Sequence, residues 1–165
     1  MRSNIIFITG PTASGKTAVA LELARLVRGE IISCDSMQVY RDMPIINQRP
    51  PEEVLKEVPH HLVEIISPEE EYSVSRFIED AKKCIEAVIA KGSRPIFSGG
   101  TGLYVKSLID GIFSSPTKDE ALREELREEA EKKGGEYLHE RLKMVDPVAA
   151  AKLHPNDVRR IIRAI

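Results

Sequence analysis

The feature that most constrains this chain is the segment from Gly10 to Thr17, which reads Gly-Pro-Thr-Ala-Ser-Gly-Lys-Thr. It fits the phosphate-loop pattern G-x-x-x-x-G-K-[ST] at every position. Residues 4–9 before it form a short apolar, β-branched run, which is typical of a buried parallel strand. Residues 18–28 after it carry apolar side chains at helical spacing, namely Val19, Leu23, Leu26 and Val27. The order of strand, glycine-rich loop and helix predicts a phosphate site at the start of the helix.

The predicted loop would bind phosphate mainly through its backbone. Its N–H groups would point inward, and the helix dipole would add partial positive charge. Lys16 would reach the terminal phosphate oxygens, and the Thr17 hydroxyl would be one ligand of a Mg²⁺ ion that keeps most of its waters. The predicted diphosphate or nucleotide contacts are Gly10, Pro11, Thr12, Ala13, Ser14, Gly15, Lys16 and Thr17.

Composition limits the class of protein. The 165 residues, 42% of them hydrophobic, are enough to bury a core. No apolar run approaches the roughly 20 residues of a membrane span, and the apolar start is too short for a signal peptide. We therefore expect a cytoplasmic protein that acts as a monomer, away from membranes. Cys34 and Cys84 fall in predicted core elements, and we expect buried, reduced thiols. A net charge of −2 does not indicate a nucleic-acid partner, so RNA contacts would need local basic clusters.

Strand and helix patterns alternate through the first two thirds of the chain. Further strands are predicted at 30–34, 61–66 and 95–98, and helices at 51–57, 73–91 and 103–110. This alternation predicts an α/β fold with a P-loop NTPase-like, doubly wound parallel sheet. Residues 114–116 read as a linker, and only helices follow, at 118–133, 136–145, 147–153 and from 156 onward. We expect a P-loop α/β domain over 1–113 and an added all-helical segment over 114–165.

Asp35 is the acidic residue that ends a predicted strand. Ligands of open α/β sheets bind outside the carboxyl ends of the strands, so Asp35 should face the same crevice as the loop. It could be an outer metal ligand, a general base for a substrate near the phosphate, or a solvent-facing turn residue. Ser36 and Gln38, with Met37 between them, could read the edge of a base through hydrogen bonds.

Two further groups of residues near predicted strands could contact ligands. Thr101 lies in the turn Gly99-Gly100-Thr101-Gly102, where a ligand could approach its hydroxyl, although it could equally cap the next helix. The strand before this turn lacks the terminal aspartate with which a phosphate-loop hydrolase holds magnesium. The adjacent His60 and His61 would point to opposite faces of a strand, so we expect structural or polar contacts rather than one metal site.

Basic residues cluster in the last predicted helix. Arg163 shares a helix face with Arg159 and with Arg160. The cluster fits contacts to phosphates of RNA or of a pyrophosphate, although a solvated charged face is the other interpretation. Arg123 lies among glutamates and by local sequence indicates only a solvated face.

Five segments of the chain together resemble the tRNA dimethylallyltransferase family. They occur in the family's order and are Gly10–Thr17, Asp35-Ser36-Met37-Gln38-Val39-Tyr40-Arg41, Pro59-His60-His61-Leu62, Gly99-Gly100-Thr101-Gly102-Leu103-Tyr104 and His154-Pro155-Asn156-Asp157-Val158-Arg159-Arg160. The resemblance implies transfer of a dimethylallyl group from dimethylallyl diphosphate to N6 of the adenosine on the 3′ side of the anticodon, with Mg²⁺ as cofactor.

The resemblance also implies roles for individual residues. The loop would hold the departing diphosphate, Asp35 would be the general base, and Thr101 would donate to the bridging oxygen. The adenosine would be flipped out of its stack to reach the site. The implied tRNA contacts are Asp35, Ser36, Met37, Gln38, Thr101, Arg123, Arg159, Arg160, Ile161, Ile162 and Arg163.

The chain departs from the family pattern in two ways. Ile46 and Asn47 stand where the family usually has a glycine-threonine pair, and Arg49 stands where it has lysine. Family members also continue beyond residue 165, so we expect the helical segment to lack its end and the short chain to be unable to catalyse by itself. Three alternatives stay open: an adenine-nucleotide isopentenyltransferase, a small-molecule P-loop kinase, and a phosphate-binding module without turnover.

Overall fold

The computed structural model describes residues 5–43, 49–111 and 119–165. The chain divides into two compact units, Met1–Phe113 and Ser114–Ile165, which are described separately below. The predicted linker at 114–116 lies outside the described residues, as do the departures Ile46 and Asn47.

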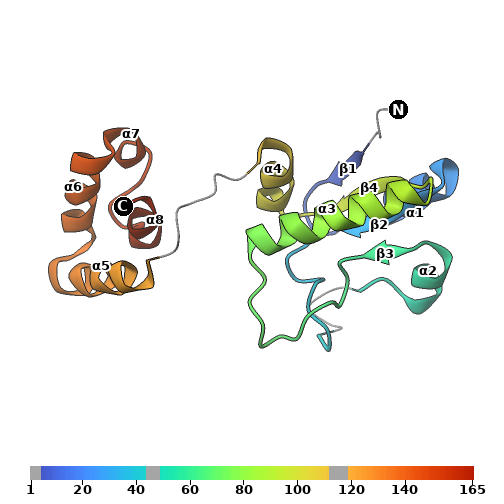
Figure 1. The fold of residues 1–165 in the computed structure, drawn as a ribbon, viewed down its shortest axis with the longest axis horizontal. Coiled ribbons are helices and arrows are strands. Elements are labelled where there is room, and N and C mark those ends of the chain that lie inside the picture. The colour runs from blue at the N-terminus through green and yellow to red at the C-terminus, as the bar shows by residue number, and fades with distance from the viewer. Residues whose placement is uncertain (1–4, 44–48, 112–118) are drawn as a thin grey trace. The chain divides into compact units, whose positions relative to one another are not determined.

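The first unit is built on a parallel sheet (Figure 1). Its strands are β1 (Ile6–Thr9), β2 (Gly29–Ser33), β3 (His60–His61) and β4 (Arg94–Gly99), in the spatial order β1-β4-β2-β3. Every recorded strand pairing is parallel, which confirms the predicted α/β fold of the P-loop NTPase-like type. The last of the described strands, β4, therefore lies between the first two, β1 and β2.

Helices cover both faces of this sheet. They are α1 (Lys16–Val27), α2 (Glu52–Glu57), α3 (Val74–Ala90) and α4 (Gly102–Asp110). On one face, Ile31 and Ile96 pack with buried residues of α1. On the other face, Ile32 and Phe97 pack with α3 and α4. Neighbouring strand residues thus serve opposite layers, as the period of two in a strand requires.

The packing face of α1 differs from the sequence pattern. Ala20 and Ala24 are the buried residues of this helix, whereas Val19 is 56% exposed and Leu26 is 81% exposed. Small side chains let the helix backbone approach the sheet closely, so the alanines form the contact face. Leu23 and Val27 are partly buried beside them.

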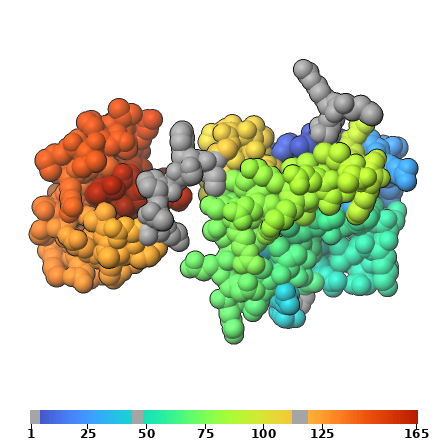
Figure 2. Space-filling view, viewed as in Figure 1, coloured from blue at the N-terminus to red at the C-terminus, as the bar shows by residue number. Residues whose placement is uncertain are grey.

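Helix α3 lies within the predicted range 73–91. The Ser73 side chain accepts a hydrogen bond from the backbone N–H of Arg76, so Ser73 is the N-cap of this helix. Phe77, Ala81 and Val88 are buried and form its packing face. In the space-filling view the side chains of α3 (green) cover the sheet face turned toward the viewer (Figure 2).

The prediction of one strand over 61–66 is wrong. The strand β3 ends at His61, and the next residues include two with a left-handed backbone, Leu62 (φ 59°) and Glu64 (φ 53°). Such angles break an extended conformation. Ile66 instead forms an isolated parallel bridge with Tyr40, so this stretch pairs with the segment that follows Asp35.

We expect Cys34 to resist alkylation. Both cysteines are free thiols; Cys34 is fully buried and Cys84 is partly buried. Burial, aided by the charge of Asp35, raises the pKa of the Cys34 thiol to about 12, so little reactive thiolate forms at pH 8. Iodoacetamide should label Cys34 only in denaturant, as peptide mass spectrometry can measure. Equal labelling rates in the folded and denatured protein would contradict this.

The second unit is helical. It contains α5 (Glu120–Lys133), α6 (Gly135–Val145), α7 (Pro147–Ala150) and α8 (Val158–Ala164). Aspartate side chains cap α5, α7 and α8, and α7 is shorter than the predicted 147–153. The unit has its own core, formed by Leu126, Leu138, Leu142, Ala150 and Ile161. Within the described ranges, no helix combines the length and apolarity needed to cross a membrane.

Candidate active site at the carboxyl edge of the sheet

The phosphate loop runs from the end of β1 into α1. Gly15 occupies the N-cap position with a left-handed φ of 83°, and no described side chain caps the helix. The first N–H groups of α1 therefore have no side-chain acceptor, which is the state that suits an anion. The Lys16 ammonium donates to the carbonyl of Pro11 at 2.6 Å, so it lies folded against the loop. A bound phosphate would compete with that carbonyl for the lysine.

Strand β4 brings the other predicted residues to this edge. Its last residue, Gly99, is paired with Thr9 of β1, and Ser98 is paired with Ser33 of β2. A Cβ on Gly99 would lie 2.2 Å from the carbonyl oxygen of Cys34, which only glycine avoids. The loop after β1, the turn after β4 and the segment after β2 consequently meet at one edge, as parallel strands predict.

Thr101 is held by the segment that contains Asp35. Its hydroxyl oxygen accepts a hydrogen bond from the backbone N–H of Ser36 at 3.0 Å, and its own N–H donates to the carbonyl of Cys34 at 3.1 Å. Although Thr101 precedes α4, its side chain makes no capping hydrogen bond to the described residues. The structure therefore does not support the interpretation that Thr101 serves only to cap α4.

Asp35 is half-buried and its carboxylate is oriented locally. Oδ1 accepts from the backbone N–H of Met37 at 2.8 Å. Within the described ranges, no lysine, arginine or histidine forms an ion pair with Asp35. Gln38 is partly buried, and its side-chain oxygen accepts from the hydroxyl of Ser33 at 2.7 Å.

The two histidines make polar contacts at β3. His60 donates from Nδ1 to the carbonyl of Val58 at 2.7 Å, and burial lowers its pKa. His61 Nε2 lies 2.7 Å from the carboxylate of Glu30. The described residues contain no group of three or more histidine, cysteine or acidic residues that could hold a metal.

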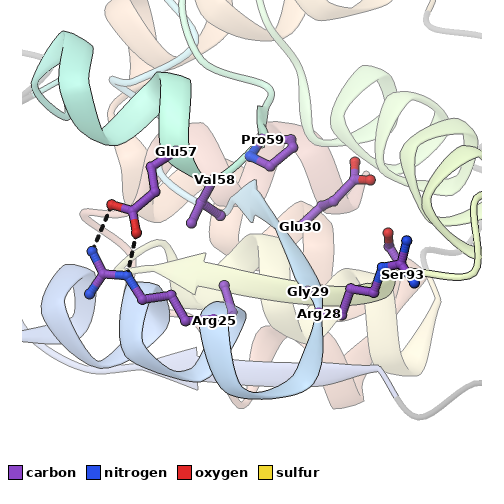
Figure 3. Close-up of a pocket in the computed structure, with 9 residues that line it drawn as sticks. Arg25, Arg28, Gly29, Glu30, Glu57, Val58, Pro59 and Ser93 are labelled. Atoms are coloured by element: carbon purple, nitrogen blue, oxygen red, sulfur yellow. Dashed lines mark hydrogen bonds and ion pairs between the residues drawn. The ribbon is translucent and has the colours of Figure 1, made fainter.

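A hollow of about 240 Å³ lies at the opposite, amino-terminal edge of the sheet. Figure 3 shows Arg25 of α1 and Glu57 of α2 pointing toward each other there, joined by hydrogen bonds of 2.6 and 2.7 Å. Glu30, which also lines the hollow, is paired with His61 and Lys91. Arg25 and Glu30 of this hollow are therefore already paired, whereas Arg28, which also lines it, forms no ion pair with any described residue.

The basic cluster of the second unit lies on α8. Arg159 and Arg163 are exposed, and neither forms an ion pair with any described residue. Arg160 is paired with Asp157 at 3.3 Å, and the partly buried Arg123 is paired with Glu120 at 3.4 Å. Two arginines of the cluster therefore remain available for another partner.

The expected contact of Ile161 with RNA does not extend to its side chain. That side chain is fully buried in the core of the helical unit, and Ile162 is partly buried against the same core. Both isoleucines fix the face of α8 that carries the arginines. A Cβ on Gly135 would lie 2.4 Å from the carbonyl oxygen of Pro155, so close packing of α6 also holds the turn before α8.

Sequence reasoning missed Ser33 and the close approach of Gly99 to Cys34. Ser33 is one polar residue in a buried strand, and its contact with Gln38 depends on how the chain turns after Asp35. A serine that follows two isoleucines in a predicted strand, five residues before a predicted base-reading glutamine, is the signal that could have drawn attention to it.

Comparison with known families covers almost the whole chain. Residues 38–165 match the family model described as IPP transferase, and residues 3–64 match the one described as isopentenyl transferase. A tRNA dimethylallyltransferase of Acetivibrio thermocellus is 51% identical over 98% of this chain. One of Geobacter metallireducens is 48% identical over 99% of it.

Solved structures give the same likeness. A tRNA isopentenylpyrophosphate transferase from Bacillus halodurans superposes with a TM-score of 0.67 at 42% identity, over 99% of this chain and 54% of that one. A eukaryotic dimethylallyltransferase acting on tRNA superposes with a TM-score of 0.78 at 32% identity, over 98% and 40% of the two chains. The present chain spans 52–53% of the length of the two curated relatives named above.

Proposed function

Because the chain belongs to the IPP transferase family, we propose that it transfers a dimethylallyl group from dimethylallyl diphosphate to N6 of the adenosine 3′ of a tRNA anticodon. The observation that carries the proposal is the meeting of the phosphate loop, Asp35 and Thr101 at one edge of the sheet. A donor diphosphate and an acceptor amine must occupy neighbouring positions in this reaction. An anion-binding loop beside a carboxylate provides both positions.

The phosphate loop would stabilise the leaving group. Negative charge grows on the bridging oxygen as the bond between carbon and oxygen breaks, and the loop N–H groups and Lys16 would balance it. Thr101 would donate its hydroxyl proton to this oxygen. The Thr101 hydroxyl accepts from the N–H of Ser36 at 3.0 Å and donates to the Ser36 hydroxyl at 3.4 Å. The bridging oxygen would replace the Ser36 hydroxyl as the acceptor of this proton. Gly10, Pro11, Thr12, Ala13, Ser14 and Gly15 complete the proposed diphosphate site.

Mg²⁺ fits the donor chemistry of this loop. Thr17 is exposed in the first turn of α1, next to Lys16, and a magnesium site usually needs only one or two protein ligands besides phosphate oxygens and water. We therefore assign Thr17 as the protein ligand. The ion would supply positive charge that stabilises the departing diphosphate.

Asp35 would act as the general base. An exocyclic adenine amine is a weak nucleophile, and removal of its proton as the new bond to carbon forms makes the attack productive. The hydrogen bond from the N–H of Met37 holds one carboxylate oxygen, which orients the other. Ser36, Met37 and Gln38 follow directly and would contact the flipped adenosine.

The proposed RNA contacts of the helical unit can be measured through salt dependence. Arg159→Ala with Arg163→Ala should weaken binding of an anticodon stem-loop about tenfold and reduce the slope of log K against log salt by about 1 to 2. The reason is that each arginine releases counterions when it contacts a phosphate. Arg123 and Arg160, already paired within the unit, should contribute less. Arg127→Ala is the matched control, since this exposed arginine pairs with Glu124. An unchanged slope in the double variant would contradict the assignment.

Transfer of label tests the proposed function. The protein is purified in the form that its cell makes. It is then incubated with radiolabelled dimethylallyl diphosphate, Mg²⁺ and unmodified tRNA, and the label in the RNA is counted. Magnesium-dependent label at the adenosine next to the anticodon is the expected result. Label appearing only when AMP replaces tRNA would favour an adenine-nucleotide isopentenyltransferase, and absence of label with either acceptor would contradict prenyl transfer.

A further inference from the structure

The lysines and arginines of the helical unit differ in whether they are paired with a carboxylate. Those that form an ion pair are Arg123, Arg127, Lys132, Lys133, Arg141, Lys143 and Arg160. In the described part of this unit, Lys152, Arg159 and Arg163 form no such pair. These three lie between residues 152 and 163, so the unpaired positive charge is gathered in α8 and in the turn before it.

Lys152 lies in the turn that connects α7 to α8, and its side chain is exposed. The family resemblance implies no role for this residue. Its backbone N–H donates to the carbonyl of Ala149 at 3.0 Å, and the N–H of Leu153 donates to the carbonyl of Ala150 at 3.2 Å. The backbone that carries Lys152 therefore has a defined conformation, although the residue lies outside a helix.

His139 of α6 ties this turn to the core of the unit. The residue is only 8% exposed, and its Nε2 lies 3.0 Å from the carbonyl oxygen of Ala150 and 2.9 Å from that of Leu153. Because a carbonyl oxygen only accepts hydrogen bonds, Nε2 must carry the hydrogen and donate to both. The two carbonyls lie on either side of Lys152, so His139 fixes the turn at both ends.

We propose that Lys152 is a further contact of this unit with the phosphate backbone of RNA, and that His139 is the positioning residue that holds the turn from which Lys152 reaches it. This inference rests on the proposed function, since the RNA is the tRNA that carries the acceptor adenosine. A lysine ammonium binds phosphate as a point charge and does not read bases. It therefore adds affinity rather than sequence preference.

The distribution of charge in the unit favours a polyanion as the partner. On α5 and α6, glutamates neutralise every lysine and arginine, so those helices offer no unpaired cation. Arg159 and Arg163 are one helical turn apart, and Lys152 precedes them by two further turns of chain. Cations spaced along the chain suit successive phosphates of a nucleic acid, whereas a single small anion needs donors that converge on one point.

The RNA contact is tested through the salt dependence of binding. The protein is used in the form that its cell makes, and its affinity for an anticodon stem-loop is measured by fluorescence anisotropy over a range of salt concentrations. Lys152→Ala should weaken binding about fivefold at low salt and reduce the slope of log K against log salt by about 1, the value for one lost phosphate contact. Lys152→Arg should keep the wild-type slope.

Lys132→Ala is the matched control for Lys152→Ala. Lys132 is an exposed lysine of the same unit, but it is paired with Glu128 at 3.0 Å. This variant should bind RNA as the wild type does. An unchanged slope in Lys152→Ala, or an equal change in both variants, overturns the proposed contact.

A double-mutant cycle tests the positioning role of His139. His139→Leu removes the N–H donor, so it should reduce the slope by up to the amount that Lys152→Ala does, and it should add little when Lys152 is already alanine. His139→Gln keeps an N–H that can donate to the two carbonyls, and it should restore wild-type binding. A variant that merely destabilised the unit would also lose the contributions of Arg159 and Arg163, and its slope would fall further.

Circular dichroism and melting temperatures show whether each His139 variant folds. The positioning role is overturned if His139→Leu weakens binding equally with and without Lys152. If His139→Leu does not fold, His139→Gln supplies the result, because a folded glutamine variant that binds like Lys152→Ala also overturns the role. A wild type that neither binds the stem-loop nor transfers label to it overturns the proposed function itself, whereas failure of the Lys152 prediction alone leaves prenyl transfer intact.

Discussion

Replacing Asp35 by asparagine is expected to lower the rate of prenyl transfer about a thousandfold, the typical contribution of a positioned general base. Asparagine keeps a side-chain oxygen that can accept from the N–H of Met37, so the local turn should persist. What is lost is the ability to take a proton from N6. The drop should therefore appear in kcat, measured in single turnovers with saturating tRNA, while RNA binding changes little.

The control for this variant is Asp42→Asn. Asp42 is exposed, lies a few residues further along the same segment and has a left-handed φ of 60°, which asparagine adopts readily. Its activity should match that of the wild type. If Asp35→Asn retained most of the rate, Asp35 would be a binding residue or a metal ligand, and the proton would need another acceptor.

Gly99→Ala is expected to cause the largest loss of stability of any single methyl group added to the sheet. The new Cβ would lie within 2.2–2.8 Å of the carbonyl oxygen, carbonyl carbon and Cα of Cys34, all of which are backbone atoms in the adjacent strand or its continuation. Backbone cannot move aside as a flexible side chain can. We expect the free energy of unfolding to fall by about 3 kcal/mol or more, as urea denaturation followed by circular dichroism measures.

Gly102→Ala provides the comparison for Gly99→Ala. A Cβ at Gly102 would meet nothing within 4 Å, and the residue is the first of α4. Alanine also reduces the entropy of the unfolded chain, so the free energy of unfolding should change by less than about 0.5 kcal/mol or rise slightly. Equal stability losses at the two glycines would mean that the distance between β4 and Cys34 is not what requires Gly99.

The phosphate loop could be predicted from sequence because its chemistry is contiguous. Eight consecutive residues between a strand and a helix contain the turn, the lysine and the hydroxyl, and no distant contact is needed to interpret them. The resemblance of five segments to one family is likewise confirmed by the family match. The sequence of neighbouring residues was enough to predict the phosphate loop and the family resemblance.

Other features depend on contacts that local sequence does not contain. The pattern Val19, Leu23, Leu26 and Val27 predicts an apolar face, yet the sheet selects Ala20 and Ala24 because they allow closer approach. The apolar residues of 61–66 predict a strand, but Leu62 and Glu64 have a left-handed backbone and Ile66 instead forms a bridge with Tyr40. The link from Ser36 to Thr101 joins segments 65 residues apart, so it requires the order of the strands.

The place of β4 between β1 and β2 has a consequence for biosynthesis. Neither β1 nor β2 can form its pairing with β4 until residue 99 has left the ribosome, so the phosphate loop and the Asp35 segment stay separate for nearly the whole synthesis of the first unit. At about 5 to 20 residues per second, unpaired strand edges persist for roughly five to twenty seconds. We expect the nascent chain to depend on chaperones during this interval and to collapse into its ligand-binding form in one late step.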